Sequence, residues 1–166
     1  MISYVFDSSS LIYLGKLKLL EKIDNSIHKF IPEKVYKEVV EKGLERNELE
    51  AEYVNQLIED KFFNIKSAKT NDLAKDVLLL SAADKEVLSL AREIKSIAII
   101  DEIYASEIAD SMGIESHGSL YIILGLIKRG KIAKKDAVKY VNRIIESGFY
   151  LSAIKYKEIL DLIKRM

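Results

Sequence analysis

The stretch ISYVFDSSSLIYLGK, residues 2–16, joins an apolar run to a cluster of carboxyl and hydroxyl groups. Residues 2–6 have the apolar character of a strand that is buried on both faces of a parallel sheet. Asp7 and the serines at positions 8–10 follow directly, where such a strand would turn into a helix. Their hydroxyls can cap that helix, and the exposed amides at its start favour a phosphate or a carboxylate.

Further along the chain, strand-like and helix-like segments alternate. Short apolar runs typical of strands occupy residues 28–31, 62–65 and 97–100. Strands that alternate with helices favour an α/β fold with crossover connections. The expected helices are residues 32–43, opened by Pro32 and ended by Gly43, then 44–61, 82–94, 120–127, 134–146 and 152–165.

Composition limits the classes of protein and site. The 166 residues suit a single domain, and no apolar run approaches the ~18 residues of a spanning helix, so we expect no membrane association and a cytoplasmic location. Cysteine is absent and only two histidines occur, which excludes thiolate sites and disfavours a zinc site. Any metal ligands should therefore be oxygens, which suit Mg²⁺ or Mn²⁺.

Charge is distributed unevenly along the chain. Residues 128–166 hold eleven Lys or Arg and four acids, a net charge of +7, so residues 1–127 carry −7. A basic tail on an acidic body could hold a polyanion near an acidic pocket. The alternative is that these cations only solvate helix surfaces.

Acidic residues follow two of the predicted strands. Asp7 comes after the first strand, and Asp101 with Glu102 comes after residues 97–100. Ligands of open parallel sheets collect beyond the carboxyl ends of the strands, so these acids are expected at one edge of the sheet. Simple N-capping is the alternative for Asp7 and for Asp101.

Two more acids lie on predicted helices. Glu38 interrupts an apolar stripe, and a buried carboxylate there would need a partner or a metal, whereas an exposed one would only be solvated. Asp84 lies in a first turn, where the helix dipole favours an acid in any case. If these acids converge with Asp7 and Asp101, a divalent cation would neutralise them, and the chemistry that follows is phosphodiester hydrolysis by a metal-bound water.

The order of these motifs resembles the PIN-domain family, in a prokaryotic PIN-like subgroup. The matching segments are FDSSSLIYLGK (6–16), IPEKVYKEVVEKG (31–43), AADKEVLSLARE (82–93) and IAIIDEIYASEIADSMGIESHGSL (97–120). The resemblance implies a three-layer α/β/α sandwich around a central parallel sheet of four or five strands. It covers residues 1–130, and residues 131–166 would form a C-terminal helical extension packed on the same domain.

The resemblance also implies a function. It implies an Mg²⁺- or Mn²⁺-dependent endoribonuclease that cuts RNA, similar to the toxin components of toxin–antitoxin pairs, which a small antitoxin protein holds inactive. Asp7, Glu38, Asp84 and Asp101 would form its catalytic quartet. Asp7, Asp84, Asp101 and Glu102 would be metal ligands, and Ser9 and Ser10 would bind substrate.

Several alternatives stay open at this stage. Many PIN domains carry Thr or Ser two residues before the last strand's acid, but this chain has Ile there, so either Asp101 or Glu102 could be the fourth acid. The apolar stripe of the last predicted helix could pair with an antitoxin helix or a second subunit, and we expect a homodimer. A non-catalytic PIN-like scaffold is one alternative function. An aspartyl phosphotransfer domain is another, but Ser9 stands where that class usually has a second acid.

Overall fold

The computed structural model describes residues 1–69, 77 and 79–166. Within them, five strands form one sheet in the order β3-β2-β1-β4-β5, and every neighbouring pair is parallel. The predicted α/β fold with a parallel sheet flanked by helices is confirmed. The strands are β1 Ser3–Phe6, β2 His28–Ile31, β3 Asn64–Ile65, β4 Ile97–Ile99 and β5 Ser116–His117.

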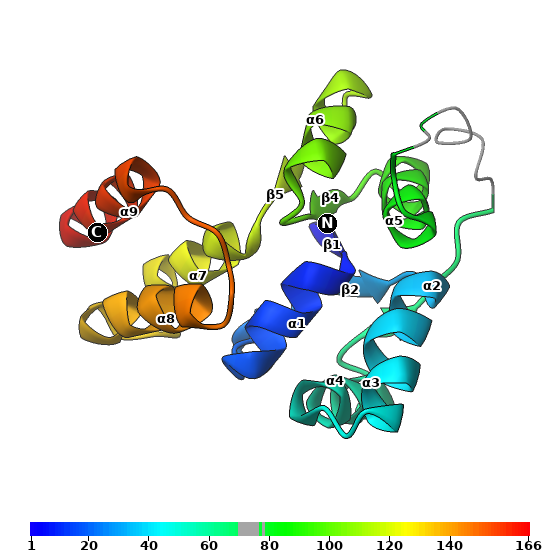
Figure 1. The fold of residues 1–166 in the computed structure, drawn as a ribbon, viewed down its shortest axis with the longest axis horizontal. Coiled ribbons are helices and arrows are strands. Elements are labelled where there is room, and N and C mark those ends of the chain that lie inside the picture. Colours follow the sequence, from blue (N-terminus) through cyan, green and yellow to red (C-terminus); the bar gives the residue numbers. More distant parts are fainter. Residues whose placement is uncertain (70–76, 78) are drawn as a thin grey trace.

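Helices cover both faces of the sheet (Figure 1). On one side lie α5 and α6, and on the other lie α1 and α4, with α7 leading away from the sheet edge. The helical elements are α1 Ser8–Lys16, η1 Leu20–Lys22, α2 Glu33–Tyr36, η2 Lys37–Glu41, α3 Lys42–Glu45, α4 Leu49–Glu59, α5 Ala82–Glu93, α6 Ile103–Ser111, α7 Ser119–Lys128, α8 Lys134–Glu146 and α9 Ala153–Arg165.

The strand order places β1 at the centre of the sheet. The chain moves outward from β1 to β2 and β3, then returns to the other side of β1 for β4 and β5. Val5 pairs with Phe30 on one side and with Ala98 on the other. This reversal makes the carboxyl ends of β1 and β4 the switch point of the sheet, where a crevice for ligands forms in open α/β folds.

The core explains why the central strands are apolar throughout. Val5 and Phe6 are fully buried, as are Ala98 and Ile99 of β4, because helices cover both faces of these strands. Edge-to-face contact between Phe6 and Phe63, with ring centroids 5.4 Å apart, connects β1 to the end of α4. The strand ends, and the residues that follow them, are therefore held rigidly.

Two predictions about the second quarter of the chain are wrong. The helix predicted to stop at Gly43 continues as α3 to Glu45, and the helix predicted from residue 44 begins only at Leu49. Gly43 is required by close packing instead, because a Cβ there would lie 2.6 Å from the Cβ of Ala51. A left-handed residue, Asn47 with φ 56°, makes the turn between the two helices.

The strand predicted at residues 62–65 is shorter than expected. Only Asn64 and Ile65 pair with β2. The backbone N–H groups of Phe62 and Phe63 donate to the Leu57 carbonyl at 2.9 and 3.4 Å, so they complete the end of α4 instead of joining the ladder. The aromatic run thus serves the helix end and the core.

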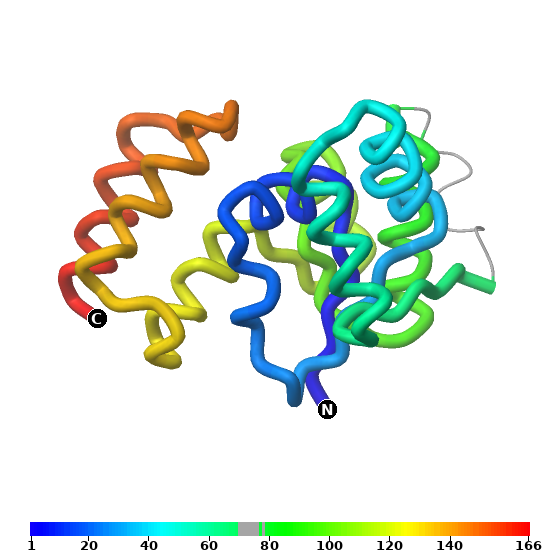
Figure 2. Tube along the Cα trace, turned by 90° about the horizontal axis from the view of Figure 1, so that it is seen from below, coloured from blue at the N-terminus to red at the C-terminus, as the bar shows by residue number. Residues whose placement is uncertain are grey.

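The last three helices extend the fold beyond the sheet. As the tube in Figure 2 shows, α8 and α9 run side by side, and their connection turns back toward the sheet. Tyr156 of α9 donates its hydroxyl to Asn142 of α8 at 2.8 Å, while Ile144 and Ile163 are buried. Among the described residues, no helix has the length and apolar character needed to cross a bilayer.

Candidate active site at the switch point

Asp7 is the buried centre of the candidate site. It follows β1 directly and is the N-cap of α1, where its Oδ1 accepts a hydrogen bond from the Ser10 backbone N–H at 2.7 Å. Its Oδ2 accepts one from the Asp101 backbone N–H at 3.1 Å. Only 1% of Asp7 is exposed. The side chain therefore combines a local cap with a contact to the neighbouring strand.

Asp101 brings a second carboxylate to the same place. It lies just beyond β4, and its Oδ1 accepts a hydrogen bond from the Ser119 backbone N–H at 2.7 Å. The Ser119 hydroxyl donates to the other oxygen. Because Ser119 is the first residue of α7, Asp101 connects the end of β4 to the start of that helix. The two strand-end acids predicted from the sequence are thus brought together.

Gly118 and Ser119 are site residues that were not assigned a role from the sequence. A Cβ at Gly118 would lie 2.8 Å from Asp101 Oδ1, so only glycine lets the carboxylate approach the chain here. Ser119 is fully buried and uses both its N–H and its hydroxyl on Asp101. A small residue followed by a hydroxyl residue after a strand was the available signal, but it is common in turns.

The electrostatics of the two acids are unfavourable without a cation. Burial raises the pKa of Asp7 to about 7, and the nearby Asp101 charge adds to the rise, while hydrogen bonds from Ser10 and Asp101 oppose it. Burial also raises the pKa of Asp101, against the hydrogen bonds from Ser119. Two carboxylates in a poorly solvated crevice repel each other, and a bound cation would relieve that repulsion.

Glu102 has a different structural role from Asp101. It is exposed, and its Oε2 accepts a hydrogen bond from the Ala105 backbone N–H at 2.6 Å, which makes it the N-cap of α6. Of the two acids left open by the sequence, Asp101 is the one placed beside Asp7. Glu102 as a metal ligand remains a prediction.

The predicted substrate-binding serines differ in exposure. Ser10 is buried, and its hydroxyl lies 3.1 Å from the Asp7 carbonyl and 3.2 Å from the Ile99 carbonyl. This hydroxyl is used to hold the β1–α1 turn against β4. Ser9 is half-buried. A direct role for either serine with substrate remains a prediction.

The two helix acids lie in more local environments. Glu38 is exposed, within the wide π-helical turn η2. Asp84 is half-buried in the first turn of α5, where the hydroxyl of Ser81, the N-cap residue, donates to its carboxylate at 2.6 Å and accepts its N–H at 3.0 Å. Helix capping accounts for these contacts of Asp84.

Glu86 is a buried acid that sequence reasoning missed. It is 5% exposed, and its Oε2 accepts the Lys34 backbone N–H at 2.8 Å. That bond attaches α5 to the first turn of α2, the helix that leads into η2 and Glu38. The signal was present in the sequence, because Glu86 lies three residues after Ala83 and four before Leu90, and this spacing puts all three on the buried face of α5.

A hollow of about 330 Å³ opens beside Asp101. Its lining includes Glu102, Gly118 and, from the connection between α8 and α9, Phe149. Phe149 packs edge-to-face on Tyr13, with ring centroids 5.4 Å apart. Burial, and then the Asp101 charge, raise the pKa of Tyr13. Phe149 therefore brings the connection between α8 and α9 next to the candidate site.

The described residues do not complete the predicted quartet. In residues 1–69, 77 and 79–166, no three acidic or histidine side chains are arranged to share one metal ion. Asp7 and Asp101 are together, whereas Glu38 and Asp84 do not join them in such a group. The site consists of a buried acid pair at the switch point of a parallel sheet.

Comparison with protein families agrees with this architecture. A family model described as a PIN domain matches residues 3–165. The chain belongs to the PIN-domain family. The match runs through α9, so the C-terminal helices of this PIN domain lie within the family's extent. A search among curated proteins found no significant match.

Proposed function

We propose that this PIN domain is a metal-dependent ribonuclease that hydrolyses RNA phosphodiester bonds at the carboxyl ends of β1 and β4. The observation that carries the proposal is the buried Asp7 carboxylate beside Asp101. Capping α1 does not explain it, because Ser or Asn caps a helix as well without burying a charge. Carboxylates with raised pKa values in a crevice are typical of functional sites.

The residues present fit Mg²⁺ or Mn²⁺. Each oxygen of Asp7 and Asp101 accepts one hydrogen bond and keeps a lone pair. Mg²⁺ is commonly held by one or two carboxylates, with water and substrate phosphate as its other ligands. Asp7 and Asp101 would hold the ion, with Asp84 and Glu102 as further predicted ligands. When bound, the ion supplies an acidified water and balances phosphate charge.

The chain's own residues prepare this site. Ser119 fixes both oxygens of Asp101, and the Asp101 N–H fixes one oxygen of Asp7, so neither carboxylate needs to reorganise. Burial keeps the dielectric low around Asp7, which strengthens its interaction with any cation. Glu38 is proposed as a catalytic residue that approaches the substrate from the helical stretch after β2.

Asp101→Asn gives the sharpest test. Asn can accept the Ser119 N–H and donate to the Ser119 hydroxyl, so the fold is kept while the charge is removed. We expect wild-type protein to cleave single-stranded RNA with Mn²⁺ or Mg²⁺ and to lose cleavage in EDTA, and Asp101→Asn and Asp7→Asn to be inactive. A nuclease-free wild-type preparation that is inert with both metals on varied RNAs would refute the proposal.

A non-catalytic PIN-like scaffold is the second candidate. It is favoured by the lack of a group of three acids among the described residues. Calorimetric titration with Mn²⁺ separates the two functions, because chemistry requires metal binding that weakens in Asp101→Asn. Metal-independent RNA or protein binding without cleavage would support the scaffold.

The toxin role and its partner are further parts of the proposal. They are supported by the resemblance of residues 1–130 to toxin components, and by apolar residues of α9 that are exposed, Ile154 and Leu162. Expression in a bacterial host should arrest growth, and Asp101→Asn should not. A gene neighbour that restores growth and co-purifies with the chain would be the antitoxin, and the mass of the purified chain would test the homodimer.

A further inference from the structure

Seven cationic side chains lie around the C-terminal end of α7, whereas the N-terminal end of this helix is at the candidate site. They come from the end of α7, the start of α8 and the end of α9, and all are exposed. The Lys134 ammonium donates to the Lys164 carbonyl, which fixes the end of α9 against the start of α8. We call this group the cationic end: Lys128, Arg129, Lys131, Lys134, Lys135, Lys164 and Arg165.

Hydrogen bonds from Ser26, and then the charges of Lys131 and Arg129, lower the pKa of Asp24, so one acid lies near the cationic end. No member of the cationic end forms an ion pair among the residues that the structure describes. The ion pairs of α8 and α9 among those residues are Lys139 with Asp136 at 3.3 Å and Lys155 with Glu158 at 2.9 Å. Neither pair includes a member of the cationic end. Like charges crowded in this way repel each other and attract a polyanion.

Helix stability does not account for the arrangement. Cations in the last turn of a helix are favoured by its dipole, which covers Lys128 in α7 and the two cations at the end of α9. Lys134 and Lys135 occupy the first turn of α8, where the dipole disfavours positive charge. The hydrogen bond from Lys134 to the Lys164 carbonyl offsets this cost for Lys134, so Lys135 is the cation that helix stability leaves unexplained.

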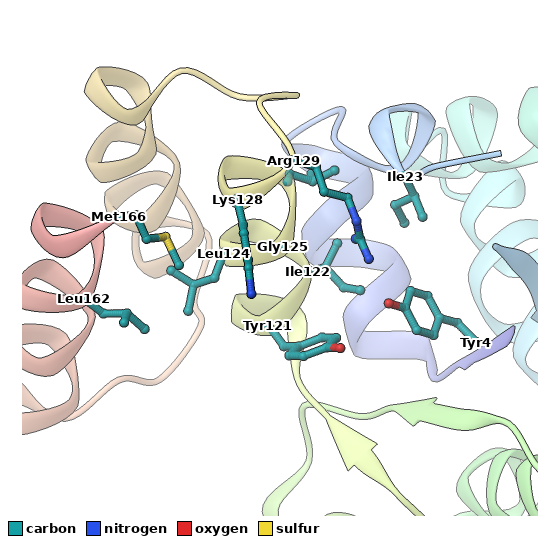
Figure 3. A pocket seen from close by; sticks show the side chains of 11 residues that line it. Tyr4, Ile23, Tyr121, Ile122, Leu124, Gly125, Lys128, Arg129, Leu162 and Met166 are labelled. Carbon is teal, nitrogen blue, oxygen red and sulfur yellow. The ribbon is translucent and has the colours of Figure 1, made fainter. Parts of the chain in front are cut away.

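A groove runs along α7 from the cationic end to Tyr121. Figure 3 shows Lys128 and Arg129 beside this groove, which has a volume of about 490 Å³, with Met166 on one side and Tyr121 at its other end. Tyr121 is 39% exposed and lies two residues after Ser119, the residue that binds Asp101. The nine-residue step from Ser119 to Lys128 spans roughly 14 Å of helix, a length that a few nucleotides can cover.

We propose that the cationic end binds the phosphates of single-stranded RNA and that the strand follows the groove along α7 as far as Tyr121, two residues from Ser119. This inference rests on the proposed ribonuclease function for its substrate. Positively charged grooves with aromatic side chains are the usual binding surfaces for single strands. Lys128, Lys131 and Lys135 carry the binding, because Lys134 is partly engaged with α9.

The test compares two triple variants with equal charge change. Lys128→Gln, Lys131→Gln and Lys135→Gln together remove cations from the cationic end, and Lys139→Gln, Lys155→Gln and Lys157→Gln remove three from the same helical hairpin outside it. Binding of a labelled RNA of about 12 nucleotides, within the range of known single-strand site sizes, is followed by fluorescence anisotropy in EDTA at several salt concentrations. Thermal unfolding by circular dichroism checks that both variants fold.

The first triple variant should weaken RNA binding at least tenfold and reduce the salt slope by about 2, since each lost contact with a single strand removes about 0.7. The control should change the affinity less than about twofold. Equal losses in both variants would overturn the inference. So would binding of polyglutamate, but not RNA, that depends on the cationic end, because the surface would then dock an acidic protein.

Cleavage assays separate this inference from the proposed function. With Mn²⁺, the first variant should raise KM and leave kcat unchanged, because its lysines do not touch the reacting phosphate. RNA binding that depends on the cationic end, without any metal-dependent cleavage, would refute the nuclease and keep the binding surface. Cleavage with a KM that is unaffected by the first variant would refute the binding surface and keep the nuclease.

Discussion

The four acids of the predicted quartet fall into two pairs with different surroundings. Asp7 and Asp101 follow strands of the central sheet, are held by backbone N–H groups from distant segments, and have raised pKa values. Glu38 and Asp84 lie on helices, one exposed and one bonded to its own N-cap serine. Strand ends at a switch point bury the charge of Asp7, whereas on the helices Glu38 is exposed to solvent and Asp84 is only half-buried.

The largest predicted effect is a loss of RNA cleavage, which should be greater for the strand-end acids than for the helix acids. Asp101→Asn should lower kcat/KM for RNA by roughly 1,000-fold, because direct charge stabilisation by a metal site is worth several kcal/mol and each 1.36 kcal/mol is tenfold. Glu38→Gln and Asp84→Asn should each lower it less. Steady-state cleavage with Mn²⁺ measures all three. Equal losses would show that the helix acids join the strand pair when metal and RNA bind.

The second prediction concerns stability and pH in the absence of metal. The folded pKa of Asp7, about 7, lies above its ordinary value of 3.8, so between these values the folded state binds more protons than the unfolded state. The stabilisation is present below pH 4 and is lost as the pH rises toward 7, by up to about 4 kcal/mol. Urea unfolding in EDTA at pH 5 and pH 8 measures it.

Asp101→Asn is the matched control for that measurement. It removes the neighbouring charge, so the pKa of Asp7 should fall, the loss of stability with pH should shrink, and the variant should exceed wild type in stability at pH 8. Added Mn²⁺ should reverse the order by stabilising wild type alone. A wild-type protein whose stability at pH 8 exceeds that of Asp101→Asn in EDTA would contradict the buried pair of charges.

The third prediction uses the glycines of the segment after β5. Gly118→Ala should lower the free energy of unfolding by about 1–3 kcal/mol and impair cleavage, because its Cβ would displace the Asp101 carboxylate. Gly125→Ala in the middle of α7 should be neutral or stabilising by up to about 1 kcal/mol, since alanine favours helix. Denaturant titration compares them. Equal stabilities would show that Asp101 can move without cost.

The smallest predicted effect concerns Glu102 and compares it with its neighbour Asp101. Glu102→Ala should cost about 1 kcal/mol through loss of the α6 N-cap and should leave cleavage within a few-fold of wild type. Thermal unfolding and cleavage assays measure both. A loss of cleavage as large as that of Asp101→Asn would make Glu102 a metal ligand, as the resemblance to PIN domains implies.

Much of the architecture was accessible from local patterns. The strand at residues 28–31 and the helix at 134–146 have the predicted bounds, because apolar runs and helical periodicity are properties of short segments. The helix end predicted at Gly43 was wrong because this glycine is needed for close packing against Ala51. A contact between two different helices cannot be recognised from the sequence around Gly43 alone. α6 was not predicted as a separate element. Its buried residues are the small Ala105 and Ala109, so it lacks the stripe of large apolar side chains that usually indicates an amphipathic helix.

The sequence by itself determined the chemical inventory: acids after two strands, no thiols, and a basic tail. Only the tertiary structure decided that β4 lies beside β1, that Asp101 and not Glu102 meets Asp7, and that three separated segments form the cationic end. The physical reason is range. Helical and strand periodicity follow from neighbouring residues, whereas burial and the approach of like charges depend on segments about ninety residues apart.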